Sequence, residues 1–221
     1  MNPIQTYLKE NEEQFMDELF SLIRIPSVSS NPEHKDDMLA CAQQWKDLLL
    51  KAGADEAMVM PSAGNPIVFA QKTVNPDAKT VLVYAHYDVM PAEPLELWKS
   101  EPFEPEIRDG KIWARGADDD KGQSFIQVKA FEYLVKHNLL THNVKFIFEG
   151  EEEIGSPSLE EFCINHKELL KACKKKAAGH YYVGMGTVGG RVPTEKGWML
   201  DNASGWIIQL VKDYEQTGDT E

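Results

Sequence analysis

Three short clusters of imidazole and carboxylate side chains are the parts of this sequence that could do chemistry. In chain order they are His86-Tyr87-Asp88, Asp118-Asp119-Asp120 and Glu149-Gly150-Glu151-Glu152-Glu153. Imidazole nitrogens and carboxylate oxygens bind divalent cations, and a carboxylate beside such a cation can act as a general base. Each cluster follows a predicted strand or stands at the start of a predicted helix, where α/β proteins place their reactive groups. We therefore expect the three clusters to converge in one crevice.

The first cluster lies at the end of a strand predicted over residues 80–89. Side chains alternate with a period of two residues along a strand, which predicts that His86 and Asp88 share a face. One of them could bind a metal while the other orients it, because a metal-bound imidazole usually donates its second N–H to an acceptor. A structural histidine that is hydrogen-bonded at the end of a strand is the alternative.

The second cluster stands at the N-terminus of a helix predicted over residues 120–136. The helix dipole favours negative charge there, so helix capping is an alternative that explains one or two of the three aspartates. Three adjacent carboxylates repel one another unless a cation is present, which favours a divalent ion. The residue types alone leave open whether Asp118, Asp119 or Asp120 would bind it.

The third cluster follows a strand predicted over residues 143–149, whose apolar residues are typical of a buried strand. Neighbouring glutamates in such a place could divide the work. One would bind a metal ion, and the other would serve as general base toward a water on that metal. A plain exposed acidic turn is the alternative.

Alternating helices and strands must position these clusters. Apolar residues at three- and four-residue spacing predict helices over residues 2–25, 35–51, 120–136 and 158–170, the last with Ser158 and Glu161 as a capping box. Strands are predicted over residues 57–60, 67–72, 80–89 and 143–149, and a turn at residues 108–111 leads into residues 112–114. The alternation predicts an α/β protein with a mixed, largely parallel sheet flanked by helices.

Composition excludes several classes of protein. The 221 residues carry a formal net charge of −13, which argues against a nucleic-acid surface and against docking on anionic lipid. Cys41, Cys163 and Cys173 are an odd number without a C-x-x-C pair, so neither a disulfide framework nor a thiolate zinc site is expected. The N-terminus has no signal-peptide pattern, and no apolar run approaches the length of about 18 residues that would span a membrane. We expect a cytoplasmic protein.

Taken in order, three motifs resemble the M20 family of zinc peptidases and deacylases. They are His86-x-Asp88, Arg115-Gly116-Ala117-x-Asp119-x-Lys121-Gly122 and Glu149-Gly150-x-Glu152-Glu153. Trp98-Lys99-Ser100, Pro102-Phe103-Glu104-Pro105 and Asp109-Gly110-Lys111 resemble the carnosine-type dipeptidase branch. The resemblance covers residues 1–172 and implies the N-terminal part of a zinc-peptidase catalytic domain.

The resemblance also implies a role for each site residue. His86 would bind one zinc ion, Asp119 would bridge two zinc ions, and Glu153 would bind the other. Glu152 would be the general base, and Asp88 would orient His86. The implied activity is hydrolysis of dipeptides or other small peptides, with Mn²⁺ or Co²⁺ as alternatives to Zn²⁺. An N-acyl amino acid deacylase with the same site and a non-catalytic degenerate fragment are the alternatives.

The sequence departs from the family pattern after residue 172. The pattern includes a further metal-binding aspartate past the glutamate pair and a distant histidine, but residues 179–185 contain no aspartate. His180 and Asp201 are the nearest candidates, and neither is assigned a role. We expect residues 173–221 to form an atypical tail with a strand at 206–211. The lid and dimerisation domain, through which family members often form homodimers, is expected to be absent.

Overall fold

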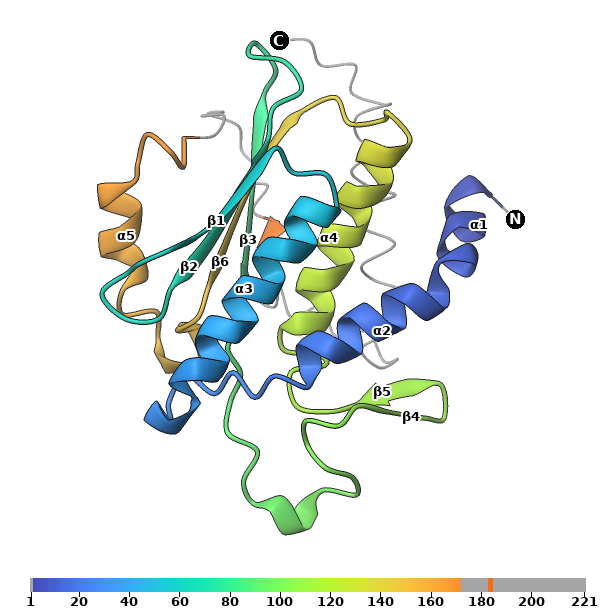
Figure 1. The fold of residues 1–221 in the computed structure, drawn as a ribbon, viewed down its shortest axis with the longest axis vertical. Coiled ribbons are helices and arrows are strands. Elements are labelled where there is room, and N and C mark those ends of the chain that lie inside the picture. The colour runs from blue at the N-terminus through green and yellow to red at the C-terminus, as the bar shows by residue number, and fades with distance from the viewer. Residues whose placement is uncertain (1, 172–182, 185–221) are drawn as a thin grey trace, which may run out of the picture. The chain divides into compact units, whose positions relative to one another are not determined.

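The computed structural model describes residues 2–171 and 183–184, and they all belong to one compact unit, Met1–Gly186 (Figure 1). The helices are α1 (Pro3–Glu10), α2 (Glu12–Ile23), α3 (Lys35–Lys51), α4 (Lys121–Lys136) and α5 (Leu159–Asn165), with short 3-10 turns η1 (Pro32–His34), η2 (Leu95–Leu97) and η3 (Glu152–Ile154). The strands are β1 (Glu56–Met60), β2 (Ile67–Lys72), β3 (Thr80–His86), β4 (Glu106–Arg108), β5 (Lys111–Trp113), β6 (Asn143–Glu149) and β7 (Val183–Gly184).

Five strands form a mixed sheet in the order β1-β2-β6-β3-β7. The pairs β1–β2 and β2–β6 are antiparallel, whereas β3 pairs in parallel with both β6 and β7. The predicted mixed sheet with flanking helices is therefore confirmed, with parallel and antiparallel pairings in equal number. The predicted turn at residues 108–111 joins β4 to β5 in a separate hairpin.

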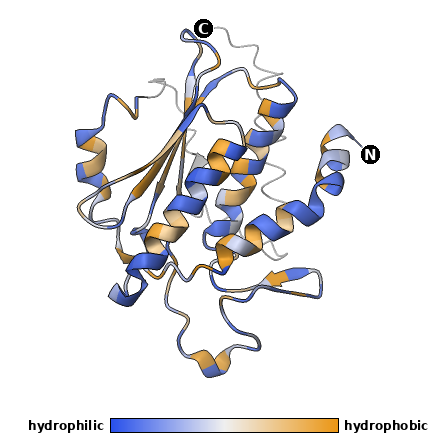
Figure 2. Ribbon diagram, viewed as in Figure 1, coloured by the Kyte–Doolittle hydropathy of each residue, from blue (hydrophilic) through white to orange (hydrophobic). Residues whose placement is uncertain are grey.

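The sheet separates two hydrophobic cores, and alternate residues of β3 face opposite ones. Val83 and Ala85 belong to the larger core, which is formed with α2, α3 and α4. Leu82 and Tyr84 pack in the smaller core, which contains Phe162 of α5. Figure 1 shows α3 and α4 in front of the sheet, and Figure 2 shows hydrophobic residues along its central strands.

The helix predicted over residues 2–25 is wrong, because two helices meet at Asn11. The side-chain amide of Asn11 donates to the carbonyl of Tyr7 at 2.8 Å, and its φ of −111° is not helical. Asparagine side chains compete in this way with the backbone hydrogen bonds of a helix. The break leaves α1 without buried residues, while α2 buries Phe15 and Leu19.

The strand predicted over residues 80–89 is too long, because β3 ends at His86. Beyond His86 the backbone turns to other partners: Tyr87 N donates to the carbonyl of Glu149 and Val89 N to that of Ser27. The prediction that His86 and Asp88 share one face of a strand is therefore wrong. The two side chains still meet, with His86 Nδ1 3.4 Å from Asp88 Oδ1.

The helix predicted over residues 158–170 is shortened to α5, and its predicted capping box is wrong. Ser158 has a helical backbone conformation and makes no side-chain capping hydrogen bond. Its N–H instead donates to Glu151 Oε2 at 3.2 Å. The tail predicted over residues 173–221, with its strand at 206–211, lies outside the described residues apart from 183–184.

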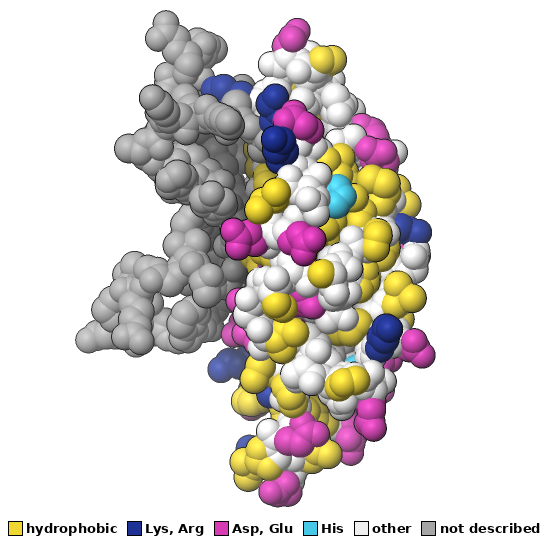
Figure 3. Space-filling view, turned by 90° about the vertical axis from the view of Figure 1, so that its left-hand side faces the viewer, with side chains coloured by type: hydrophobic (Ala, Val, Ile, Leu, Met, Phe, Trp, Pro, Cys, Tyr) yellow, Lys and Arg dark blue, Asp and Glu magenta, His cyan; other side chains and the backbone are white. Residues whose placement is uncertain are grey.

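The surface of the described part agrees with the acidic composition. On the face shown in Figure 3, acidic, basic and hydrophobic side chains are interspersed, and no continuous basic patch is visible among the described residues. Within those residues, the structure contains no helix that is long and apolar enough to cross a membrane.

Candidate metal centre

The carboxyl ends of β3 and β6 bring the first and third clusters together. These strands are parallel neighbours, and their register pairs His86 with Glu149. The second cluster joins them from the N-terminus of α4: His86 Nε2 lies 3.2 Å from Asp119 Oδ1 and 4.0 Å from Glu152 Oε2. Carboxylates of the second cluster, Asp119 and Asp120, and of the third, Glu152, thus lie within 4.0 Å of one imidazole nitrogen of the first, so the three clusters meet as the sequence predicts.

His86 is buried and surrounded by carboxylates. Its Nδ1 faces Asp88, 3.1 Å from the backbone carbonyl and 3.4 Å from Oδ1, while Nε2 faces Asp119. Burial lowers the pKa of His86, but the hydrogen bonds to Asp119 and Asp88 outweigh it and raise that pKa to about 11. The imidazole is therefore held in one orientation, with Nε2 directed at the second cluster.

Asp88 connects His86 to the glutamate turn. This fully buried carboxylate accepts hydrogen bonds from the N–H groups of Glu152 at 3.2 Å and Glu153 at 3.1 Å. The same carboxylate lies beside His86 Nδ1. A single side chain thus fixes the position of the histidine relative to both glutamates.

The three consecutive aspartates have three different environments. Asp118 is exposed, with Oδ1 3.5 Å from Gln123 Nε2, and Asp119 is exposed but turned toward His86. Asp120 is buried, and its Oδ2 accepts from Ser124 Oγ at 2.9 Å and from the N–H of His86 at 3.3 Å. It makes no side-chain capping hydrogen bond to α4, so capping does not account for it.

The pKa values follow these environments. Burial raises the pKa of Asp120 to about 7, and Asp120 Oδ1 is buried without a hydrogen-bond partner among the residues that the structure describes. The hydrogen bond with His86 lowers the pKa of Asp119. Burial, together with the neighbouring Asp119 carboxylate, raises the pKa of Glu153. Negative charge is therefore in excess around one imidazole.

Two residues of the glutamate cluster, Glu149 and Glu151, have a structural role, because their carboxylates accept hydrogen bonds from other parts of the fold. Glu149 is buried and accepts from the Tyr84 hydroxyl and from Ser156 Oγ, the latter at 2.9 Å. Glu151 is also buried and accepts from the backbone N–H groups of Asn65 at 3.1 Å and Ser158 at 3.2 Å. The alternative of a plain exposed turn is therefore wrong.

Glu152 and Glu153 are the two glutamates of the cluster whose carboxylates remain available to the candidate metal site. The Glu152 side chain is 38% exposed, and Glu153 Oε1 accepts from the N–H of Met90 at 3.2 Å. Gly150 leaves room for the side chains of Tyr87 and Met38, because a Cβ at this position would collide with the Tyr87 hydroxyl and with Met38. The motif resemblance singles out Glu152 and Glu153, but the sequence pattern does not reveal the structural partners of Glu149 and Glu151.

The side chains at this site are of types that bind divalent cations, although the described residues are not arranged to surround one. Among the described residues, no group of three or more histidine, cysteine, aspartate or glutamate side chains is arranged so that it could hold a metal ion. Two tetrahedral zinc ligands lie about 3.3 Å apart, given zinc–ligand distances of about 2.0 Å. The 3.2 Å between His86 Nε2 and Asp119 Oδ1 matches that spacing. His180 and Asp201 lie outside the described residues.

The comparison with protein families agrees with the motifs. Residues 82–198, more than half of the 221-residue chain, match the model of Peptidase family M20/M25/M40. The chain belongs to this family. The match continues past residue 172, so the M20 likeness reaches further into the tail than the motifs indicate.

Several relatives of this M20 chain are named as peptidases. It is 30% identical over 172 residues to the probable di- and tripeptidase DUG2 of Saccharomyces cerevisiae, covering 72% of this chain and 20% of that protein. It is 30% identical over 175 residues to human Beta-Ala-His dipeptidase, covering 73% of this chain and 34% of that protein. A solved structure, the M20 family metallo-carboxypeptidase Sso-CP2 from Sulfolobus solfataricus, is 36% identical with a TM-score of 0.67, covering 72% of this chain and 35% of that one. The M20 chain thus spans between a fifth and about a third of the length of these proteins.

Proposed function

We propose that this M20 chain carries the metal-binding and catalytic front part of a dipeptidase that hydrolyses dipeptides or other small peptides. The observation that supports the proposal best is the approach of Asp119 and Glu152 to a single imidazole nitrogen of His86, at 3.2 and 4.0 Å. The dipeptidase names of the relatives support the substrate class. We propose the cytoplasm as its location, in line with the cysteine pattern.

In this proposal two zinc ions occupy the site, with Mn²⁺ or Co²⁺ as alternatives. His86 would bind one, Glu153 the other, and Asp119 both. Bound zinc would polarise the scissile carbonyl and lower the pKa of a water molecule. Glu152, partly exposed beside His86, would accept the proton of that water and pass it to the leaving amine. Asp88 would hold the imidazole of His86 and the backbone of the glutamate turn in place.

We further propose that residues 1–172 form a partial catalytic domain and residues 173–221 a distinct tail. This division predicts that residues 1–172 bind metal through His86, Asp119 and Glu153, regardless of which further residues complete the metal site.

The direct test is the metal content of the purified 221-residue chain, measured by elemental analysis with dipeptide hydrolysis assayed in parallel. Asp119→Ala is expected to lose both metal and turnover. The matched control is Asp118→Ala, which removes the exposed neighbouring carboxylate and should leave metal content unchanged. Absence of metal and turnover in the wild-type chain would favour the degenerate-fragment alternative.

The deacylase alternative needs its own assay. The wild-type chain would be supplied with a panel of dipeptides, including β-Ala-His, and a matched panel of N-acetyl amino acids. Faster turnover of dipeptides is the expected result. Turnover confined to the acylated amino acids would replace the dipeptidase proposal with the deacylase one, while leaving the metal ligands unchanged.

A further inference from the structure

We infer that Lys121 is a positioning residue that anchors the aspartate loop, residues 116–121, to the carboxyl end of α2 and so holds Asp119 beside His86. The role in metal binding rests on the function proposed above. The anchoring itself rests on contacts of the described residues alone.

The first observation is the environment of the Lys121 ammonium group. The side chain is fully buried, and Nζ donates to the carbonyl of Leu22 at 2.9 Å and to that of Ile25 at 2.6 Å. Burying an ammonium group is costly unless acceptors satisfy it. Carbonyls at the carboxyl end of a helix are such acceptors, because they form the negative end of the helix dipole. Lys121 therefore binds the last turn of α2 from 99 residues away in the sequence.

The second observation is that the aspartate loop is closed tightly on itself. Lys121 N donates to the carbonyl of Gly116 at 3.1 Å. This hydrogen bond closes a loop that contains the three aspartates. The following residue must be a glycine, because a Cβ on Gly122 would collide with the carbonyl of Ala117. The hydrogen bond and the close approach of Gly122 to Ala117 tie the two ends of the loop together, so a displacement of Lys121 would be transmitted to Asp119.

The third observation is that Ser27, just beyond α2, also forms hydrogen bonds with the segment that follows His86, residues 87–89. Ser27 Oγ donates to the carbonyl of Tyr87 at 2.7 Å, and Val89 N donates to the carbonyl of Ser27 at 2.9 Å. Lys121 binds Ile25, which lies two residues before Ser27. The two segments that carry His86 and Asp119 are thus fastened to the same stretch of chain. Lys121 sets the position of one relative to the other.

Lys145 provides a matched control. Its ammonium group also donates to two backbone carbonyls, those of Leu169 at 2.6 Å and Lys171 at 2.9 Å. Lys145 lies four residues before Glu149 on β6, roughly 13 Å away at the rise of a strand. Lys145→Met therefore removes the same kind of hydrogen bonds at a distance from the site.

The experiment compares zinc affinity of the wild-type chain, Lys121→Met and Lys145→Met, each corrected for its folded fraction. We expect Lys121→Met to bind zinc about tenfold or more weakly, as is typical when a group that supports metal ligands is lost. Lys145→Met should bind like the wild type. Wild-type affinity in Lys121→Met, or an equal loss in Lys145→Met, would overturn the inference.

A second measurement separates the inference from the proposed function. Amide hydrogen exchange of the metal-free chains is expected to quicken at residues 116–124 in Lys121→Met and to stay unchanged there in Lys145→Met. If the wild-type chain binds no zinc, the proposed function fails, and the exchange result alone decides the anchoring. Unchanged exchange at residues 116–124 would overturn it.

Lys121→Arg serves if Lys121→Met does not fold. Arginine keeps the charge, but its planar guanidinium cannot reproduce the contacts of an ammonium group in a fully buried site. The expected result is a folded chain with weaker zinc binding and faster exchange at residues 116–124. Wild-type values for both quantities would overturn the inference.

Discussion

At the scale of single residues, Asp88 is the side chain on which the site depends most. It is fully buried, and its carboxylate serves His86 Nδ1 and the N–H groups of Glu152 and Glu153. Those three partners belong to two strand ends that are more than 60 residues apart in the sequence. A buried carboxylate that is shared in this way both orients the imidazole of His86 and fixes the backbone of the glutamate turn.

Asp88→Asn is expected to weaken zinc binding by about tenfold to a hundredfold, because the amide presents only one acceptor oxygen and no charge to three partners. Isothermal titration with zinc would measure the change. Asp118→Asn, which removes an exposed charge in the second cluster, should bind zinc like the wild type. Equal affinities for Asp88→Asn and the wild type would exclude the orienting role.

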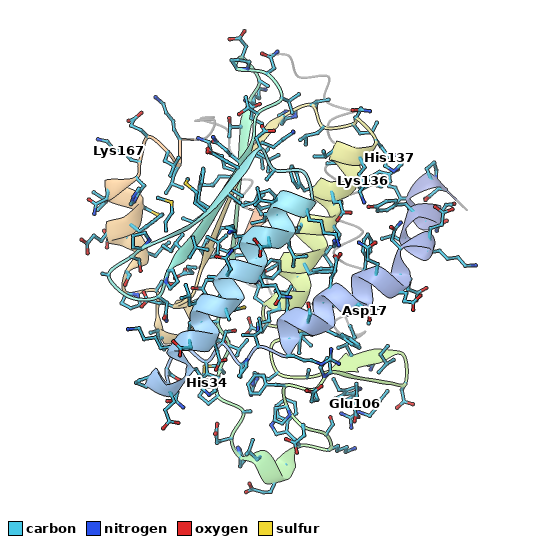
Figure 4. The ribbon with its side chains drawn as sticks, viewed as in Figure 1. Asp17, His34, Glu106, Lys136, His137 and Lys167 are labelled. Carbon is cyan, nitrogen blue, oxygen red and sulfur yellow. The ribbon has the colours of Figure 1, made fainter. Side chains whose placement is uncertain are left out.

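At the scale of elements, a chain of ion pairs connects the helices that cover one face of the sheet. Lys129 of α4 is buried between Glu18 of α2 and Glu132 of α4. Glu132 is also paired with Lys136 at 2.5 Å and accepts from the Tyr7 hydroxyl of α1 at 3.3 Å. Figure 4 shows Lys136 at the end of α4 nearest to α1. This network holds the N-terminal helices, and with them the α2 end, against α4.

Lys129→Met is expected to cost about 3 kcal/mol, because it leaves the carboxylate of Glu132, which is 1% exposed, without its buried partner. Urea denaturation would measure the loss. The control is Lys136→Met, whose side chain is 48% exposed, so that the cost of losing its ion pair is reduced by solvent and should be smaller than that of Lys129→Met. Equal losses for the two variants would contradict the network as described.

The same network predicts sensitivity to acid. Burial raises the pKa of Glu132, but the hydrogen bonds from Lys129 and Lys136 outweigh it and hold that pKa below its usual value of 4.5. Stability from the charged Glu132 is then fully present above pH 4.5 and is lost as the pH falls through the lower folded-state pKa. Urea midpoints measured from pH 7 to pH 3 should fall more steeply in the wild type than in Glu132→Gln. Parallel curves would count against this prediction.

At the scale of the whole molecule, the parallel pairing of β3 with β6 decides where the chemistry lies. It sets His86 beside Glu149 at one edge of the sheet, and α4 begins at the same edge. The carboxylates gathered there repel one another, and burial, together with this repulsion, raises the pKa values of Glu153 and Asp120. A bound cation would remove this repulsion and stabilise the folded chain.

Zinc is therefore expected to raise the melting temperature of the 221-residue chain. Free zinc at roughly 100 times its Kd would add about 2.7 kcal/mol, which corresponds to a rise of roughly 5–10 °C for a chain of this size. Thermal scans with zinc, and with a chelator added afterwards, would measure the rise and its reversal. Asp119→Ala should show no rise, and a rise in that variant equal to the wild type would place the zinc elsewhere.

The family, the alternation of helices and strands and the three clusters that meet were all predictable from the amino-acid sequence. Local periodicity and motif order are properties of short segments, so strands such as 67–72 and 143–149 were predictable to the residue. Where the break at Asn11 and the end of β3 fall depends on particular hydrogen bonds, which periodicity does not contain.

Only the folded structure shows the environment of each acidic residue. Asp118, Asp119 and Asp120 are chemically the same, and only packing against His86 and Ser124 makes one exposed, one directed at the imidazole and one buried. Lys121 reads in the sequence as one more polar residue of a charged motif, yet it is fully buried. Burial and hydrogen-bond partners arise from contacts between distant segments, such as Lys121 with Leu22, and no local pattern encodes them.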